Sequence, residues 1–396
     1  MLAAVDQIAT RGAAATSARS VAAAAGAAAS AINYNFGGIE HLFAAAFGHG
    51  VEATASWQER VECDIAALPT GPAGAALALE HVIVEWTSSG RSLALLYQEA
   101  LATAPGVGPA AAWTQLWRDF WRRAATRCGL GETEARLMHA LFESEALYNL
   151  SSWSPALERA ALRELCDHAA HIWFGASFRA PAGAFALAEQ TAGVLTEGSV
   201  APAALKIAEA AAAVVEDAGL GGLTHRAVAA RAGVTTGAVT YHFRTAEDLT
   251  AGAVRGQVMA MAAPAENPSW RPRTNMLTVE QLFDGIADYA VTERPWGPSL
   301  RRRHLFLAAV RRPELAASAA VIRFAHGGTL GRNLEELFEV PPALRSLHAG
   351  SMSRIISSSW FACAVDSESR VEQRRLLEAM WRGALAALPQ RPTPVD

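Results

Sequence analysis

The stretch "GVTTGAVTYHF", Gly233–Phe243, decides the fold because a counterpart, "GAAASAINYNF", lies 207 residues earlier at Gly26–Phe36. Without a gap, Gly12–Leu42 aligns with Gly219–Leu249, and 12 of the 31 aligned positions are identical. Four identities are Ala, which an Ala-rich chain supplies by chance, but the other eight are Gly, Arg, Val, Tyr, Phe, Glu or Leu. A repeat of this kind has to be recognised before the fold is assigned. It indicates one unit written twice.

Short matches continue downstream at nearly the same offset. "SSW" occurs at 151–153 and 358–360, and Trp173 meets Trp381 after a one-residue slip. The duplication therefore extends over a whole unit, with the join in a segment that contains Pro181, Gly183, Gly193, Gly198 and Pro202. We predict a head at 1–43, a helical body at 44–177, a linker at 178–202, a second head at 203–250 and a second body at 251–396. Residues 1–177 are called the first unit and residues 203–396 the second unit.

The composition predicts a helical protein of two or three domains. The chain has 396 residues, of which 51% are hydrophobic and many are Ala, the best helix former. The net charge of −4 favours neither a general nucleic-acid coat nor an acidic tail. We therefore expect an all-α fold, with helices in the bodies over segments such as 39–58, 110–127 and 313–337.

Cysteine usage and hydropathy suggest where the protein works. Cys63, Cys128, Cys166 and Cys363 form no CxxC pair, so reduced thiols and a cytoplasmic location are expected. The N-terminus has no basic segment followed by an apolar core, and no apolar run reads as a membrane span. We expect neither a signal peptide nor a membrane partner.

The second copy contains the pattern of a helix-turn-helix. An amphipathic stretch, 205–215, is followed by Gly219 as a helix stop. Thr224 can cap a short helix over 225–232, Gly233 ends that helix, and Thr235 can cap the next helix over 236–243. Two short helices joined by a tight turn with Gly make this motif.

The charges of this copy suit a phosphate-lined groove. Between Ala218 and Arg244 the chain has Arg226, Arg231 and Arg244 and no carboxylate. Arg side chains and helix N-termini hold phosphates, whereas short polar side chains reach base edges. The alternative is a small three-helix core with a solvated face, and the repetition of the motif argues against it.

These residues resemble a known family. "LTHRAVAARAGVTTGAVTYHFRTAEDL" is similar to the DNA-binding domain of the tetracycline-repressor (TetR) family of bacterial regulators, and "SARSVAAAAGAAASAINYNFGGIEHLF" resembles it too. The resemblance covers roughly 45 residues in each copy. It implies a double-stranded DNA operator as partner, helical ligand-binding bodies, and action as a dimer whose reading helices lie about one DNA turn apart. Here the dimer would be an intramolecular pseudo-dimer. Its interface would place Leu141, Ala146 and Leu150 near Ile355, Ile356 and Trp360.

The resemblance also implies roles for individual residues. In the second copy the groove or its rim would be faced by Thr236, Gly237, Thr240, Tyr241 and His242, and phosphates would be held by Thr224, Arg226 and Arg244, with Thr235 at the helix start. In the first copy the reading positions are Ala29, Ser30, Asn33, Tyr34 and Asn35, and the phosphate side is Ser17 and Arg19.

The first copy departs from the pattern. Its first helix is about a turn shorter, and Ala24 and Gly37 stand where the second copy has Arg231 and Arg244. Each lost hydrogen bond to a charged group is worth about 1.5–3 kcal/mol. Two hypotheses follow: a ligand-released repressor that uses both heads on a non-palindromic operator, or a small-molecule-binding regulator with a degenerate first head that must pair with a second chain.

Aromatic residues indicate where an effector would bind. "WTQLWRDFWRR" places Trp113, Trp117 and Phe120 on one helical face. With Trp86 and Tyr97 they are the candidate wall of a pocket for a small apolar effector. The weaker counterparts in the second unit are Trp296, His304 and Phe306. The alternative is an aromatic core stripe.

Other chemistry is not expected. His139, His168 and His171 lack a second cluster to complete a metal site, so we predict no metal and no cofactor. GxSxG, HExxH, P-loop and GxGxxG motifs in a strand context are missing from the sequence, which argues against an enzyme.

Overall fold

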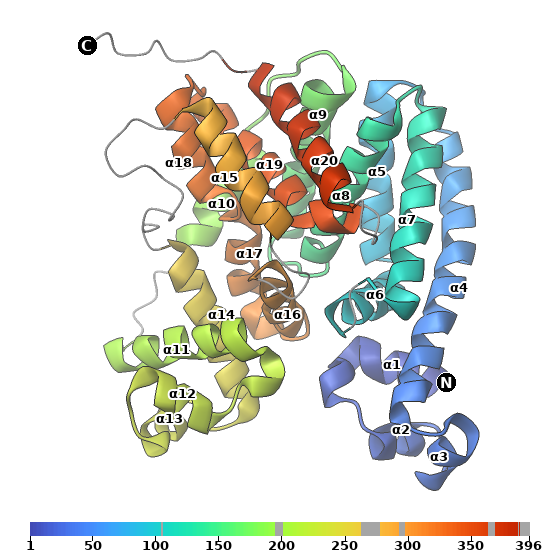
Figure 1. The fold of residues 1–396 in the computed structure, drawn as a ribbon, viewed down its shortest axis with the longest axis vertical. Coiled ribbons are helices and arrows are strands. Elements are labelled where there is room, and N and C mark those ends of the chain that lie inside the picture. The colour runs from blue at the N-terminus through green and yellow to red at the C-terminus, as the bar shows by residue number, and fades with distance from the viewer. Residues whose placement is uncertain are drawn as a thin grey trace.

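The protein is all-α, as predicted. The computed structural model describes residues 1–103, 106–194, 201–262, 278–292, 298–362, 369–386 and 388. Within these residues the regular elements are α-helices and short 3₁₀ turns (Figure 1). None of the helices so described has both the length and the apolar character needed to cross a bilayer.

The two units contain corresponding helices. The elements of the first unit are α1 (Leu2–Arg11), η1 (Ala13–Ala15), α2 (Ala18–Ala24), α3 (Ser30–Phe36), α4 (Ile39–Ala66), α5 (Pro72–Thr87), α6 (Arg91–Thr103), α7 (Gly108–Arg127), α8 (Glu132–Tyr148) and α9 (Pro155–Phe174). Those of the second unit are α11 (Pro202–Ala218), η2 (Leu220–Gly222), α12 (His225–Ala232), α13 (Thr236–His242), α14 (Ala246–Ala262), α15 (Val279–Thr292), α16 (Pro298–Val310), η3 (Pro313–Leu315), α17 (Ala316–Phe324), α18 (Gly328–Leu337), α19 (Pro342–Ala362) and α20 (Ser369–Ala386). Helix α16 matches α6 residue for residue at the 207-residue offset.

The segment 178–202 is not an extended linker throughout. Residues 184–194 form α10 (Ala184–Val194), which packs on α9 of the first unit and on α17 and α19 of the second. Glu164 accepts hydrogen bonds from the backbone N–H groups of Ala184 and Phe185, both at 2.9 Å, so it caps the first turn of α10. The Pro and Gly residues predict a linker. Residues 184–194 of this segment instead form a helix, and Glu164 of α9 caps its first turn.

The prediction of one helix over 313–337 is also wrong. This segment forms η3, α17 and α18, with a break at Gly327, whose φ is +117°. A Cβ at Gly327 would lie 2.8 Å from the carbonyl oxygen of Ala349, so only Gly allows α19 to approach this closely. At the same offset the first unit has Phe120, inside the unbroken helix α7.

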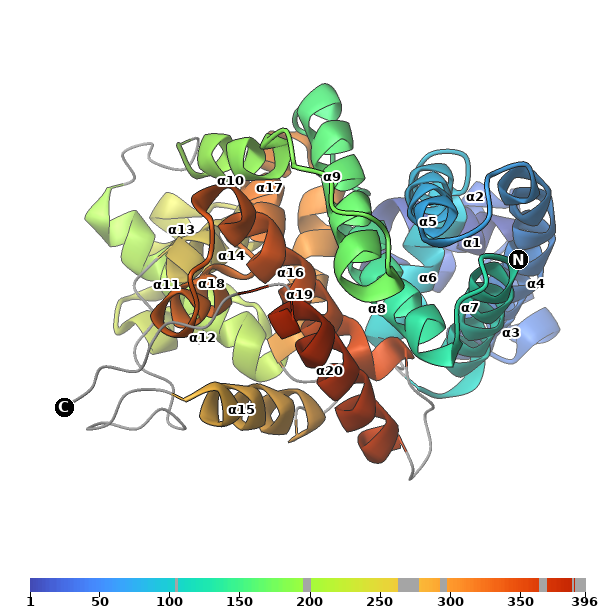
Figure 2. The same ribbon diagram turned by 90° about the horizontal axis from the view of Figure 1, so that it is seen from above.

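The bodies join through four helices. Helix α8 packs along α19, and α20 packs against α8 and α9. Seen from above, α9 and α20 lie between α5 and α7 on one side and α11 and α14 on the other (Figure 2). Leu141 of α8 and Ile355 of α19 are fully buried, and the indole N–H of Trp173 in α9 donates to the carbonyl oxygen of Met380 in α20 at 2.9 Å.

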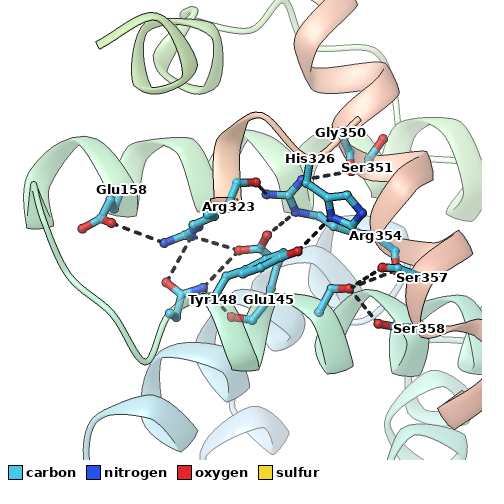
Figure 3. A network of polar contacts seen from close by, with 12 residues as sticks. Glu145, Tyr148, Glu158, Arg323, His326, Gly350, Ser351, Arg354, Ser357 and Ser358 are labelled. Atoms are coloured by element: carbon cyan, nitrogen blue, oxygen red, sulfur yellow. Dashed lines mark hydrogen bonds and ion pairs between the residues drawn. The ribbon is translucent and has the colours of Figure 1, made fainter. Parts of the chain in front are cut away.

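A buried polar network crosses this contact (Figure 3). Glu145 of α8 accepts hydrogen bonds from Arg354 of α19 and, at 2.9 Å, from Arg323 of α17. Arg354 also donates to the carbonyl oxygens of Gly350 and Arg323, each at 3.0 Å. Tyr148 shares a hydrogen bond of 2.9 Å with Nδ1 of His326. The three charged side chains of this network, Glu145, Arg323 and Arg354, are each at most 2% exposed.

The ion pairs decide the charge of Glu145. Burial alone raises the pKa of its carboxyl, but Arg354 and Arg323 outweigh burial and lower that pKa below its ordinary value. A buried carboxylate costs several kcal/mol to dehydrate unless it is paired and hydrogen-bonded. Glu145 therefore needs both arginines of the second unit in place.

A second buried contact joins the two units at α9 and α19. Nε2 of His168 and Nδ1 of His348 are 3.2 Å apart, and both side chains are buried. Burial, with the nearby His348 and His171 adding to it, lowers the pKa of His168 to about 3. Burial likewise lowers the pKa of His348 to about 4.

These pKa values predict an acid-sensitive fold. The unfolded chain protonates both groups near pH 6.5, whereas the folded chain resists protonation until about pH 3–4. The free energy of unfolding should therefore fall as the pH drops from about 6.5 to about 4, by up to about 1.4 kcal/mol per pH unit for each group. Chemical unfolding at several pH values should show a flatter profile for His168→Gln than for the unchanged protein. Exposed His41→Gln is the matched control, and an equally flat profile for that variant would contradict the assignment.

Candidate DNA-binding interface

The second head is a helix-turn-helix built as the sequence predicts. Thr224 accepts a hydrogen bond from the N–H of Ala227 at 3.1 Å, and Thr235 accepts one from the N–H of Ala238 at 3.2 Å. Gly233 ends α12 with a φ of +65°, the left-handed conformation that favours Gly. The predicted caps and the turn are confirmed.

The first head has the same helices, with a capped α2 but no side-chain cap at α3. Ser17 accepts from the N–H of Ser20 at 3.1 Å, and the Ser20 hydroxyl accepts from the N–H of Ser17 at 3.0 Å, a capping box at the start of α2. Helix α3 has no side-chain cap, because Ala28 stands at the position of Thr235. Loss of such a cap costs about 1 kcal/mol, so the reading helix of the first head is the less firmly held.

Both reading helices present the predicted residues to solvent. Val239 and Ile32 are buried beneath them, and the next turn exposes Tyr241 at 80% and Tyr34 at 91%. Large aromatic side chains this exposed suit a binding surface rather than a core. The same exposed face carries Thr235, Thr236, Gly237 and Thr240 on the second head and Ala29, Ser30, Asn33 and Asn35 on the first, whereas His242 is half-buried.

Some polar groups on this face are already hydrogen-bonded. Thr240 donates to the carbonyl oxygen of Thr236 at 3.0 Å, and the amide of Asn35 donates to the carbonyl oxygen of Ala31 at 2.8 Å. A side chain that pairs with its own helix has to rotate before it donates to a base. Among the residues that the structure describes, Asn33 has no such partner in its own helix, and its side chain is exposed on α3.

The positive surface is smaller than the sequence suggests. Arg226, Arg244 and Arg19 are exposed. Arg231, in contrast, forms an ion pair of 2.7 Å with Asp217, which lies just before the acid-free stretch. An exposed pair of this kind is worth about 0–1 kcal/mol, so a phosphate can displace Asp217.

The stretch that follows α13 is held in place by a carboxylate. Asp248 accepts hydrogen bonds from the N–H groups of Arg244 and Thr245, at 3.1 and 3.0 Å. The hydrogen bond from Thr245 lowers the pKa of Asp248, so this carboxylate stays charged. The backbone of Arg244 is fixed by this arrangement, while its side chain extends into solvent.

The two heads lie at the same end of the molecule. Figure 1 shows α2 and α3 below α1, and α12 and α13 below α11, with α16 above and between the two heads. The four helices that join the bodies are at the opposite end. Both reading helices can therefore be approached from one side.

The expected effector wall is a packed aromatic cluster. Trp86, Tyr97, Trp113, Trp117 and Phe120 are all 0% exposed. The ring centroids of Trp86 and Trp117 are 5.0 Å apart, and those of Trp117 and Phe120 are 5.5 Å apart, both in edge-on contact. Sequence reasoning missed Trp57, Trp121 and Phe142, which belong to the same cluster, although Trp121 lies inside the quoted motif.

Small cavities lie elsewhere in the part of the chain that the structure describes. One, between α8, α16 and α19, is lined by Ser144, Phe306 and Ser358 among others, and another lies beside α18. Each has a volume of about 20 Å³, which suits water rather than an effector. The packing of the aromatic cluster is what the core alternative predicts.

The predicted effector-site residues of the second unit form no comparable cluster among the described residues. His304 is largely buried on α16, and burial lowers its pKa. Trp296 lies outside the described residues. In place of Phe120 and Trp121 the second unit has Gly327 and Gly328, so it lacks the two aromatic rings of these positions.

The aromatic cluster predicts the effect of truncation. Trp117→Ala should lower the free energy of unfolding by about 3–5 kcal/mol, because it leaves a large cavity among packed rings. Denaturant unfolding measures this change, with Tyr34→Ala as a control that removes an exposed ring. A Trp117→Ala protein of unchanged stability would favour a preformed pocket over a core.

The comparisons with known proteins agree with the two heads. Residues 1–46 and again residues 207–252 match the sequence model described as "Bacterial regulatory proteins, tetR family". No curated protein matches the chain. Regulators of this family are generally non-enzymatic. With two such domains in one all-α chain, the protein is a tandem-duplicated, DNA-binding transcriptional regulator of the TetR family.

Proposed function

We propose that the protein is a repressor that binds one non-palindromic operator with both heads of a single chain and is released by a small effector. The observation that carries this proposal is the pairing of charges between the two units. Four arginines of the second unit contact carboxylates of the first: Arg303 with Glu143, Arg311 with Glu99, and Arg323 and Arg354 with Glu145.

This pairing cannot be reproduced by two identical units. At the 207-residue offset the counterparts of Arg303, Arg323 and Arg354 are Leu96, Leu116 and Leu147, and the counterpart of Glu145 is Met352. If two first units paired symmetrically through α8, Glu145 would be buried opposite Leu147. Removing one partner of a buried ion pair costs about 3–5 kcal/mol. The charges therefore favour pairing between the first and second units of the chain.

The oligomeric state tests the single-chain arrangement. We expect dilute protein to have a mass near 41.8 kDa, that of one chain, in multi-angle light scattering. A stable mass of twice this value would favour the alternative, in which a degenerate first head requires a second chain.

Matched tyrosine variants distinguish the two hypotheses at the DNA. Tyr241→Ala should weaken operator binding by about 1–3 kcal/mol, because Tyr241 ends the exposed face of the reading helix. If both heads read DNA, Tyr34→Ala should weaken binding as well. Gel-shift titrations at fixed salt measure both, and an unchanged affinity for Tyr34→Ala would indicate a silent first head.

The operator should be asymmetric. The second head presents Thr236, Thr240 and His242, and the first presents Asn33 and Asn35. Asn pairs bidentately with adenine, whereas Thr makes a single hydrogen bond or contacts the thymine methyl group. Selection from a random DNA pool should return two different half-sites, with the first head's half richer in adenine.

Mutations in the second head's half-site should cost more affinity. The first head lacks the counterparts of Arg244 and of the cap Thr235, and each phosphate contact supports binding of its half-site. A palindromic consensus would contradict the single-chain proposal and indicate two chains that use one equivalent head each.

The effector proposal is supported by unpaired polar groups in the aromatic cluster. Among the residues that the structure describes, the indole N–H groups of Trp86, Trp117 and Trp121 are buried without a hydrogen-bond partner. A small, mainly apolar molecule with hydrogen-bond acceptors would satisfy them, provided that the rings move apart. Release of operator DNA by such a compound, with a parallel change in Trp fluorescence, tests the proposal.

A regulator that binds operator DNA in a bacterial cell would work in the cytoplasm, and we propose this location for the protein.

A further inference from the structure

The end of α16 touches both heads through two adjacent residues. Arg311 reaches the first head, where Nε donates to the carbonyl oxygen of Ala9 at 3.3 Å and Nη2 to that of Ile8 at 3.4 Å. Arg312 donates to the carbonyl oxygen of Glu247 at the start of α14, within the second head. The figures agree with these contacts, because α16 lies between the two heads (Figure 1).

At the contact with the first head, Arg311 forms an ion pair with Glu99, and both side chains also hydrogen-bond to the backbone of the first head. Nη2 of Arg311 is 2.7 Å from Oε1 of Glu99 on α6, and both side chains are mostly buried. Oε2 of Glu99 accepts a hydrogen bond from the N–H of Ala13 at 2.9 Å. The carboxylate thus holds the turn after α1, while the guanidinium holds the last carbonyl groups of α1, where a cation is favourable.

The backbone between these groups allows the close approach. Gly12 has a φ of +86°, and a Cβ at this position would lie 3.2 Å from Oε1 of Glu99 and 3.4 Å from Nη1 of Arg311. The turn between α1 and α2 is therefore fitted against the ion pair. We call Gly12, Glu99 and Arg311 the α1 clamp.

Within the described residues, the clamp is found at the first head. At the 207-residue offset Glu99 corresponds to Phe306 and Arg311 to Ala104, so the second head has neither charge. Phe306 packs on Tyr148 instead, with ring centroids 5.2 Å apart. The second unit thus holds the first head through Arg311, and nothing in the repeat requires this contact for the fold of either head.

We propose that Arg311 is a positioning residue that fixes the first head relative to the second and so selects one spacing between the two half-sites of the operator. The proposal rests on the proposed function, in which both heads bind DNA. Without the clamp, α1 and its reading helix keep their own packing but lose their fixed distance from the second head. The protein then binds DNA with the optimum half-site spacing less tightly, whereas its affinity for DNA with other spacings does not fall.

The first experiment needs no DNA. Ala23 and Ala230, exposed and equivalent positions on α2 and α12, are replaced by Cys and spin-labelled, with Cys63 and Cys363 replaced by Ser. The labels report the distance between the heads. The distance distribution should be narrow in the protein with Arg311 and broad in Arg311→Gln and in Glu99→Gln. Arg136→Gln is the matched control, because Arg136 pairs with Glu372 across the units at 3.2 Å, among the joining helices. An unchanged distribution in Arg311→Gln overturns the clamp.

The second experiment measures affinity for DNA whose half-sites are one or two base pairs closer or farther apart. Arg311→Gln should lose about tenfold in affinity at the optimum spacing, show a flatter dependence on spacing, and bind a probe with only the second head's half-site as before. The double variant Glu99→Gln/Arg311→Gln should lose no more than either single variant.

The outcomes separate the two proposals. An equal loss at every spacing and on the half-site probe would mean that Arg311 acts on folding or on general affinity, and would overturn its role in spacing. If the unchanged protein shows no preference for spacing, the proposed two-headed binding fails, and the selection of spacing fails with it, while the label distances still decide whether the clamp holds the first head.

Discussion

The structure depends on one buried carboxylate, Glu145, which lies between two arginines of the other unit. Its charge is stable only where Arg354 and Arg323 offset the cost of removing it from water. Neither unit can bury its side of this contact alone. The network links α8 of the first unit to α17 and α19 of the second, and so holds together the two bodies that carry the heads (Figure 3).

The duplication has become asymmetric at the positions that matter for pairing and for DNA. In the pairs made by Arg303, Arg311, Arg323 and Arg354 the carboxylates lie on the first unit and the arginines on the second, whereas the pair of Arg136 with Glu372 has the opposite arrangement. The heads are also unequal, because Thr235 caps α13 whereas α3 has no side-chain cap. The less firmly capped head is the one that Arg311 of the second unit holds.

Local rules predicted the heads well. Thr224, Gly233 and Thr235 act within a few residues of their own position, so their roles can be read from the order of residues. The same rules failed for 184–194 and for 313–337, where distant groups decide. Glu164 of α9 caps the helix α10, and the approach of the Ala349 backbone breaks the helix at Gly327. Arg231 similarly pairs with Asp217 from the preceding helix.

The sequence by itself determined that the chain is all-α, that one unit occurs twice, and which residues the reading helices expose, because repeats, caps and helical periodicity are properties of neighbouring residues. Only the tertiary structure decided which arginine meets which carboxylate, and that Trp86, Trp113 and Trp117 pack as a cluster. An aromatic stripe has the same pattern whether it lines a pocket or fills a core. Likewise, an arginine shows its partner only when helices far apart in the chain are brought together.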